Sequence, residues 1–222
     1  MPCETALWTS LGPGSDVSDA SIGDRSAREK WNRRYLEKDW RPFPDAPSRW
    51  LLENRSLVVA AAGRRALDVA CGDGRNAVYL ARCGFDVDAV DVSDVAIDAL
   101  RAAALARDLA VSPHQMDLEA DLLPVERYDV IVQINYLQRD LFGPLAQALT
   151  PGGILIVETV TRAHIDELGQ SFDQRFVLER NELLRSFPDL DVRHYWEGVA
   201  DRSGRPRGVA SLVAQRPAGE RC

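Results

Sequence analysis

Lysine is almost absent from this chain of 222 residues, in which only Lys30 and Lys38 occur. Both precede the first strand that the sequence predicts, so every later side chain with a permanent positive charge is an arginine. A P-loop lysine, a Schiff-base lysine in the core and the tyrosine-lysine pair of some dehydrogenases are therefore excluded. The function has to be built from arginines, acids and glycines.

Cysteine, long apolar runs and net positive charge are also lacking. The four cysteines, at positions 3, 71, 83 and 222, have neither metal-site spacing nor the density of a disulfide scaffold, so we expect reduced thiols and no metal. No apolar run approaches a membrane span and no signal pattern opens the chain, which predicts a cytoplasmic protein without a membrane partner. The net charge of -7 argues against a nucleic-acid partner.

Composition divides the chain into a tail and one domain. Residues 1–25 are rich in Ser, Asp and Gly without an apolar period, so we expect them to be disordered. Order is expected from Ser26 or Ala27, and residues 26–217 are long enough to form one α/β domain with a sizeable core.

The most informative stretch begins at a short apolar run, residues 66–70, that predicts a buried parallel strand. Gly72 and Gly74 follow, and a helix is expected over 76–82. The glycines allow a sharp turn and leave no Cβ in the way of a ligand, while the first amides of the helix face it. This arrangement predicts a ligand lying over the loop.

A second predicted strand, residues 86–90, ends at Asp91. An acid about twenty residues beyond such a loop is where the hydroxyl groups of a ribose are held. The sequence therefore predicts a nucleoside site.

Two nucleosides fit this pattern. With Ala77, the glycines match the dinucleotide fingerprint G-x-G-x-x-A, which makes an NAD-dependent oxidoreductase one alternative. However, Asp68 and Asp73 stand at the loop, and two carboxylates repel a pyrophosphate. S-adenosylmethionine (SAM) carries no phosphate, and its ammonium and sulfonium groups tolerate nearby acids. The charges favour SAM.

The loop resembles the acid-x-G-x-G-x-G motif of class I SAM-dependent methyltransferases, with Asp68, Gly72 and Gly74 in place and Ala70 for the first glycine. The resemblance implies a Rossmann-like α/β fold: a seven-stranded mostly parallel sheet with helices on both faces and an antiparallel C-terminal hairpin. Further strands are expected over 111–116, 128–134, 154–160, 192–199 and 208–215, and further helices over 48–52, 93–108, 141–149 and 180–187. A Pro-Gly-Gly turn at 151–153 also matches the family.

The same resemblance assigns the cofactor contacts. A Trp-x-x-Arg-Tyr segment would fold over SAM as a lid, with packing on the core as the alternative. Asp117 would accept the adenine amino group beside an apolar neighbour, with a turn acid as the alternative. The implied residues are Trp31, Arg34, Tyr35, Asp68, Ala70, Gly72, Gly74, Arg75, Asn76, Asp91, Val92, Met116, Asp117, Leu118 and Gln133.

Within the class, residues 31–215 look like the branch of tellurite-resistance and thiopurine-type methyltransferases, although Asp201-Arg202 stands where tellurite-active members carry His-Arg. The methyl acceptor would then be a small molecule. Tyr136 and Arg139 follow the fourth strand, and Arg202 is followed by two more arginines in the last hairpin, at 205 and 207.

If these arginines converge on one mouth, they would draw in a small anionic or soft acceptor such as a chalcogen oxyanion or a thiol. The alternative is a solvated arginine-rich turn. An acceptor that has to lose a proton would need a base, for which Tyr136, Asp140 and His194 are candidates. A SAM-binding protein without catalysis stays open, as does the choice between monomer and homodimer.

Overall fold

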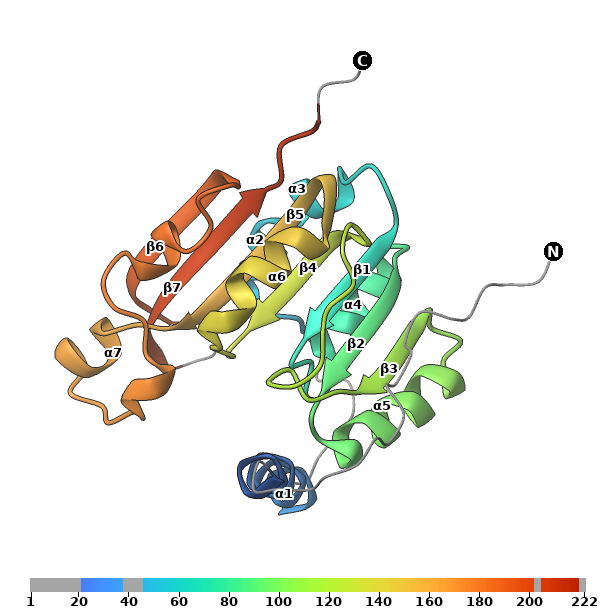
Figure 1. The fold of residues 1–222 in the computed structure, drawn as a ribbon, viewed down its shortest axis with the longest axis horizontal. Helices are drawn as coiled ribbons and strands as arrows, with labels where there is room; N and C mark the ends of the chain where they lie inside the picture. Colours follow the sequence, from blue (N-terminus) through green and yellow to red (C-terminus); the bar gives the residue numbers. More distant parts are fainter. Residues whose placement is uncertain (1–20, 38–45, 202–204, 220–222) are drawn as a thin grey trace.

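The chain is built on one seven-stranded sheet, seen in a computed structural model that describes residues 21–37, 46–201 and 205–219 (Figure 1). The order across the sheet is β3-β2-β1-β4-β5-β7-β6. The first five strands are parallel, and β7 pairs antiparallel with both β5 and β6. The strands are β1 Arg65–Val69, β2 Asp86–Asp91, β3 Val111–Gln115, β4 Tyr128–Ile134, β5 Leu149–Val160, β6 Asp191–Asp201 and β7 Pro206–Gln215. The predicted fold class is confirmed.

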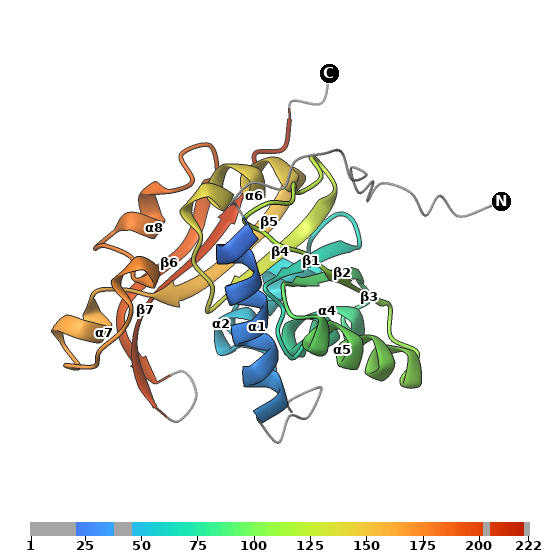
Figure 2. The same cartoon turned by 60° about the horizontal axis from the view of Figure 1, so that its bottom comes forward.

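Helices cover both faces of this sheet, as its buried strands require. One core joins α2, α3, α4 and α5 to one face, and a second core joins α6 and α8 to the other. Figure 2 shows α1 crossing in front of the sheet, where it packs on α5. The helices are α1 Ser21–Glu37, α2 Arg49–Glu53, α3 Arg55–Val59, α4 Arg75–Arg82, α5 Asp94–Ala106, α6 Phe142–Ala148, α7 Ala163–Asp166 and α8 Glu182–Arg185, with single 3₁₀ turns at Arg139–Leu141 and Gln174–Phe176.

The strand order reverses between β1 and β4, which are neighbours although two strands separate them in sequence. Chain segments leaving these two strands diverge to opposite sides, so a crevice opens at the carboxyl ends of the strands. In Figure 1, α1 is seen end-on beside this edge of the sheet. The fold therefore places the glycine loop after β1 at the position where such sheets bind ligands.

The boundaries differ from expectation at three places. The helix α1 begins at Ser21, inside the predicted tail, while residues 1–20 lie outside the described part of the chain, so their predicted disorder stays a prediction. The predicted turn at 151–153 is instead an irregularity within β5, because the main chain of Gly152 and Gly153 bonds with Arg216 and prolongs the ladder. The last predicted helix shortens to the single turn α8. None of the helices in the described ranges has the length and apolar character needed to cross a bilayer.

Asp88 on β2 joins several strands at the end of the sheet opposite the glycine loop. Its carboxylate accepts a 2.9 Å bond from the Tyr128 hydroxyl and lies 3.4 to 3.5 Å from nitrogens of Arg127, Arg65 and His114. Burial raises the pKa of Asp88, but the bonds from His114 and Tyr128 and the charge of Arg127 outweigh it, and the net shift is downward. A lowered pKa means that this stabilisation is present above the ordinary aspartate pKa and is lost as the pH falls.

We expect Asp88→Ala to reduce the free energy of unfolding by about 3 kcal/mol, because it leaves the buried Tyr128 hydroxyl and the half-buried cations around it without their acceptor. Urea denaturation at pH 7 measures this. Asp98→Ala is the matched control, since the Asp98 side chain is 73% exposed in its pair with Arg101 and its loss should cost under about 1 kcal/mol. Equal losses in the two variants would contradict a structural role for Asp88.

Candidate active site

The loop between β1 and α4 is held in a conformation that glycine makes possible. Gly72 has φ 52° and Gly74 has φ 76°, both in the left-handed region. A Cβ on Gly74 would come within 2.4 Å of the Leu100 side chain on α5, so α5 also requires glycine here. The amide of Cys71 donates to the carbonyl of Val90, which ties the loop to β2. The result is a bare main-chain surface at the carboxyl ends of β1 and β2.

Asp68 anchors the first turn of α4 beneath this loop. Its Oδ2 accepts a 2.9 Å bond from the amide of Ala77, and the side chain is almost wholly buried. Burial raises the pKa of Asp68 to about 7, opposed by the Ala77 bond and by the charge of Arg75. A carboxylate in this state gains from any cation that binds nearby.

Asp91 ends β2 with both carboxylate oxygens aligned by the main chain. Oδ2 accepts the amide of Gly72 and Oδ1 accepts the amide of Ser93, each at 2.9 Å. Burial raises the pKa of Asp91, and the charge of Asp73 adds to the rise, while the two amides oppose it. A carboxylate has about four acceptor positions, so each oxygen keeps one for a ligand hydroxyl. The geometry suits a pair of ribose hydroxyls.

Helix α1 lies over the glycine loop. A Cβ on Gly72 would stand 2.5 Å from the Tyr35 hydroxyl, so this hydroxyl rests directly on the loop. Burial raises the pKa of Tyr35, as do the charges of Asp91 and Asp73, and the phenol therefore stays protonated. The predicted lid segment is thus helical, and its Tyr35 lies against the glycine loop. Trp31 pairs with Tyr35 at 6.2 Å between ring centroids.

A polar latch fixes α1 to the first turn of α5. Asn32 donates to Asp94 at 2.6 Å and accepts from the Ser93 hydroxyl at 2.7 Å. Arg28 adds an ion pair with Asp94, whose pKa is lowered to about 2 by the bonds from Arg28 and Asn32. Arg34, the remaining named residue of the predicted lid, has its guanidinium carbon 5.1 Å from the centre of the Trp31 ring. The latch residues carried no recognisable motif, and the sequence interpretation missed them.

The end of β4 adds an unsatisfied polar atom. Gln133 is fully buried, its Nε2 donates to the carbonyl of Tyr136 at 3.0 Å, and its Oε1 has no partner among the described residues. An orphaned buried acceptor costs free energy unless a ligand or water satisfies it. A hydrogen-bond donor on a bound ligand would satisfy this atom.

Tyr136 belongs to a link between two loops at this edge. Its hydroxyl donates to Gln138 at 2.6 Å, and Gln138 donates in turn to the carbonyl of Leu118 at 2.9 Å. Burial raises the pKa of Tyr136, as do the charges of Glu119 and Asp117, so this phenol is a poor base. Gln138, which the sequence interpretation did not single out, joins the two loops.

The remaining residues that were predicted to contact the cofactor lie in different surroundings. Met116 and Leu118 are buried in the core beside β4, and Asp117 Oδ1 accepts the amide of Glu119 in a turn. Ala70 adopts a left-handed φ of 51° before the glycines, and the carbonyl of Val92 accepts from Gln115. The turn contact agrees with the alternative that Asp117 is a turn acid.

A cavity of about 270 Å³ opens beside the loop, at the ends of β4, β5 and β7. Arg207 donates to Asn135 Oδ1 at 2.8 Å, and Asn135 follows β4 with a left-handed φ of 60°. Glu158 of β5 is buried there and accepts a 2.7 Å bond from Ser211. The lining consists of Ala46, Pro47, Ser48, Arg49, Leu52, Arg75, Asn135, Glu158, Arg207 and Val209.

This cavity is cationic, because Arg75 and Arg207 line it with a single glutamate, Glu158, while Arg49 is paired with Glu53. Burial lowers the pKa of Arg207, Glu158 raises it and the neighbouring Arg75 lowers it, so Arg207 and Arg75 are near enough to repel. An anion between two such guanidinium groups relieves the repulsion. Asn76, expected at the cofactor, accepts the amide of Ser48 and fixes the start of α2 beside the cavity.

Arg139 does not join this cluster, which corrects the expectation that it converges with the hairpin arginines. Its guanidinium binds Glu182 at 2.6 and 3.0 Å, and its other bonds go to the carbonyls of Arg175 and Val177. This contact set is structural. Arg202 lies outside the described residues, and no group of three or more potential metal ligands gathers in the described part of the chain.

Comparison with known proteins identifies a family and several similar sequences. The family model described as "Methyltransferase domain" matches residues 33–199. "Hemagglutinin 1" of Eikenella corrodens is 29% identical over 178 residues, covering 73% of this chain and 58% of that protein. "Ubiquinone biosynthesis O-methyltransferase" of a Chelativorans strain is 31% identical over 105 residues, covering 45% and 42%. The chain thus spans about half the length of the curated relatives it matches.

Solved structures agree on the fold. The protein studied for the conversion of a disulfide bond into a thioacetal group during echinomycin biosynthesis superimposes with a TM-score of 0.68 at 17% identity, over 87% of this chain and 93% of that one. TehB from Haemophilus influenzae gives 0.61 at 20% identity, over 85% and 66%. A SAM-dependent methyltransferase from Mesorhizobium loti gives 0.59 at 20% identity, over 74% and 96%.

Proposed function

This chain belongs to the methyltransferase-domain family, whose cofactor is SAM, and on that premise we propose that it transfers a methyl group from SAM to a small anionic acceptor. The observation that carries the acceptor class is the cavity beside the glycine loop that Arg75 and Arg207 both line. The family supports methyl transfer over the alternative of an NAD-dependent oxidoreductase.

The loop residues fit the cofactor. Gly72 and Gly74 form the bare surface, Asp91 offers two aligned oxygens to the ribose, and the orphaned Oε1 of Gln133 suits a donor such as the ammonium group. Tyr35 would exclude water from above. When bound, SAM supplies an electrophilic methyl group on a sulfonium.

Methyl transfer depends on how the protein positions the acceptor and needs no covalent intermediate with the protein. SAM would supply the methyl group as an electrophile and would leave as S-adenosylhomocysteine, keeping the electron pair of the carbon–sulfur bond, while the residues of the cavity would hold the acceptor anion whose lone pair takes the methyl group. An acceptor that is already anionic has no proton to lose, so no base is required. Arg75 and Arg207 would hold the anion in line with the methyl, and orientation of this kind supplies several kcal/mol.

The acceptor is expected to be small and either anionic or soft. Chalcogen oxyanions and thiols remain in this class, the thiols reacting as thiolates that have already lost their proton to solvent. Among the described residues that line the cavity, the one carboxylate is Glu158, which Ser211 engages. The test is the release of S-adenosylhomocysteine with a panel of thiols, carboxylates, selenite and tellurite. Turnover confined to large neutral acceptors would overturn the proposal. SAM binding without any turnover would favour the non-catalytic alternative.

We expect the affinity for SAM to rise between about pH 6 and pH 8, because the pKa of Asp68 is about 7 without a ligand. That pKa lies above the ordinary value of 3.8, so ionisation of Asp68 costs stability as the pH rises towards 7. A bound cation removes this cost and favours the ionised form. Below pH 7, binding must therefore release a proton, and affinity falls by up to about tenfold per pH unit.

Calorimetry with SAM across this pH range measures the effect. Asp68→Asn keeps an acceptor for the amide of Ala77 and should bind more weakly with a flat profile. Asp94→Asn is the control, since the pKa of Asp94 is about 2 and its charge does not change in this range. A slope that persists in Asp68→Asn would assign the pH dependence to another group.

A further inference from the structure

Asn135, the residue that follows β4, has its side-chain amide held in one orientation beside the charged cavity. Its Oδ1 accepts a 2.8 Å bond from the guanidinium of Arg207, and both residues line the cavity. A guanidinium has donors and no acceptor, so the amide atom that faces it must be the oxygen. The amide nitrogen, with its two N–H donors, has no partner among the described residues.

The main chain fixes where this side chain begins. Asn135 has a left-handed φ of 60°, and its amide donates to the carbonyl of Glu158 on β5 at 2.8 Å. Asparagine is enriched among the residues other than glycine that adopt such a conformation. Turn geometry alone would therefore explain an asparagine here, as it does for Asn181, which has φ 58° at the start of α8. The bond from Arg207 is what distinguishes Asn135 from a turn residue.

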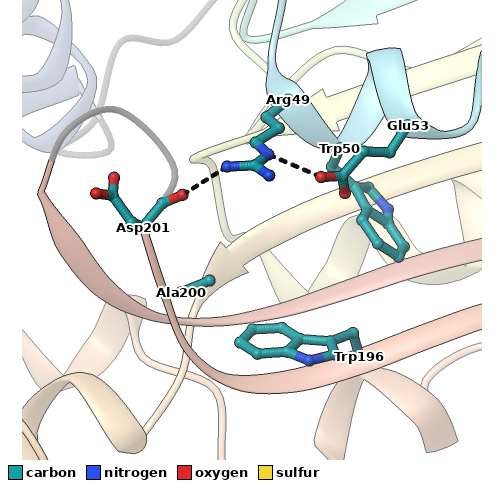
Figure 3. A pocket seen from close by; sticks show the side chains of 6 residues that line it. All are labelled: Arg49, Trp50, Glu53, Trp196, Ala200 and Asp201. Atoms are coloured by element: carbon teal, nitrogen blue, oxygen red, sulfur yellow. Dashed lines mark hydrogen bonds and ion pairs between the residues drawn. The ribbon is translucent and has the colours of Figure 1, made fainter.

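An amide is also a neutral partner for Arg207. Arg49, which lines the same cavity, has its guanidinium between the Glu53 carboxylate and the main-chain carbonyl of Asp201 (Figure 3). Within the described ranges Arg207 forms no such pair with a carboxylate, and its one bond goes to Asn135. Asn135 therefore orients this guanidinium without neutralising it, and the positive charge stays available to a ligand.

We propose that Asn135 determines which charge the acceptor carries: with Oδ1 held by Arg207, its Nδ2 donates a hydrogen bond to the anionic group of the acceptor. This rests on the proposed function and adds to it a residue that selects the acceptor. An anion would accept from the amide and from the guanidinium groups of Arg75 and Arg207, and such charge-assisted bonds are strong. A cationic acceptor would meet only donors and like charges at these three side chains.

The test uses three thiols with the same two-carbon chain. Mercaptoacetate carries an anionic group, 2-mercaptoethanol a neutral one and cysteamine a cationic one. Release of S-adenosylhomocysteine by the wild-type protein should give kcat/KM values that fall in this order. Asn135→Asp keeps an acceptor of the same size for Arg207 but replaces the N–H donors with a negative charge. It should raise KM for mercaptoacetate at least about a hundredfold and reverse the preference in favour of cysteamine.

A glycine variant separates the side chain from the turn. Asn135→Gly should stay folded, because glycine adopts left-handed conformations without strain. It should raise KM for mercaptoacetate about tenfold, as expected for a lost hydrogen bond to a charged group, with a smaller change for 2-mercaptoethanol. Asn181→Gly is the matched control, since it makes the same substitution at φ 58° and should leave both KM values unchanged. Equal effects of the two glycine variants would show that Asn135 serves the turn alone.

A binding readout separates this inference from the proposed function. Calorimetry with the protein saturated in S-adenosylhomocysteine measures the binding of mercaptoacetate without turnover. Binding that is lost in both Arg207→Ala and Asn135→Asp supports the role of Asn135, even if no thiol is methylated and the proposed function fails for thiols. Binding that is lost in Arg207→Ala but kept in Asn135→Asp overturns the inference and leaves the proposed function standing. No binding to the wild-type protein overturns both.

Discussion

Replacement of Asp91 by alanine is expected to weaken SAM binding by at least about a hundredfold. Two hydrogen bonds from ribose hydroxyls to a charged acceptor are worth about 1.5 kcal/mol or more each, and about 3 kcal/mol corresponds to two orders of magnitude in affinity. The carboxylate also accepts the amides of Gly72 and Ser93, so its loss frees the loop that forms the floor of the site. Isothermal calorimetry with SAM measures the change.

A second variant separates the ligand contact from the loop contact. Asp91→Asn keeps one acceptor for the main chain but replaces the other with a donor, so it should stay folded and still lose most of the affinity. Asp98→Ala serves as the neighbouring control, because Asp98 on α5 is 73% exposed and pairs with Arg101, away from the loop and from α1. If SAM binds Asp91→Ala as tightly as wild type, the ribose lies elsewhere.

The position of Asp91 shows what the sequence could predict. A strand was expected over 86–90, and β2 ends one residue later, at Asp91 itself. Alternation, glycines and the spacing of an acid are local signals, and local signals place strands and the loop between them. The helix after the loop was expected from residue 76 and begins at Arg75.

The acceptor cavity shows what the sequence could not predict. Arg75, Glu158 and Arg207 come from three elements that only the sheet brings together, and each sequence neighbourhood is compatible with a solvated residue. Arg139 was singled out because it follows β4, yet Glu182, which lies 43 residues further along the chain, binds its guanidinium. The packing of segments that are distant in sequence decides which arginine pairs with a carboxylate and which lines the cavity.

Two left-handed residues escaped prediction for a related reason. Ala70 and Asn135 end the two strands on either side of the switch point, with φ of 51° and 60°. Such values are uncommon for residues other than glycine, and surrounding structure holds them at functional sites. Here the strained turns direct the chain away from β1 and β4 where the crevice opens.

Arg207→Ala is expected to lower kcat/KM with anionic acceptors by about a hundredfold while leaving the dissociation constant for SAM within about twofold of wild type. Removal of one partner from a partly buried, charge-assisted contact costs about 2 kcal/mol or more. Arg207 lines the cavity, where it donates to Asn135, and lies outside the loop proposed to hold the ribose. Steady-state kinetics and calorimetry on the same preparation separate the two effects.

Two other arginines provide matched controls. Arg205→Ala removes an exposed cation two residues away on the same hairpin, so it tests for a merely general loss of positive charge and should change kcat/KM by less than about twofold. Arg139→Ala should lower stability through the loss of its bonds to Glu182 without a selective effect on anionic acceptors. Uncharged acceptors should lose little in Arg207→Ala, because they gain little from a guanidinium group. Equal losses for charged and uncharged acceptors, or equal effects of Arg205→Ala and Arg207→Ala, would show that Arg207 supports the hairpin and does not bind the anion.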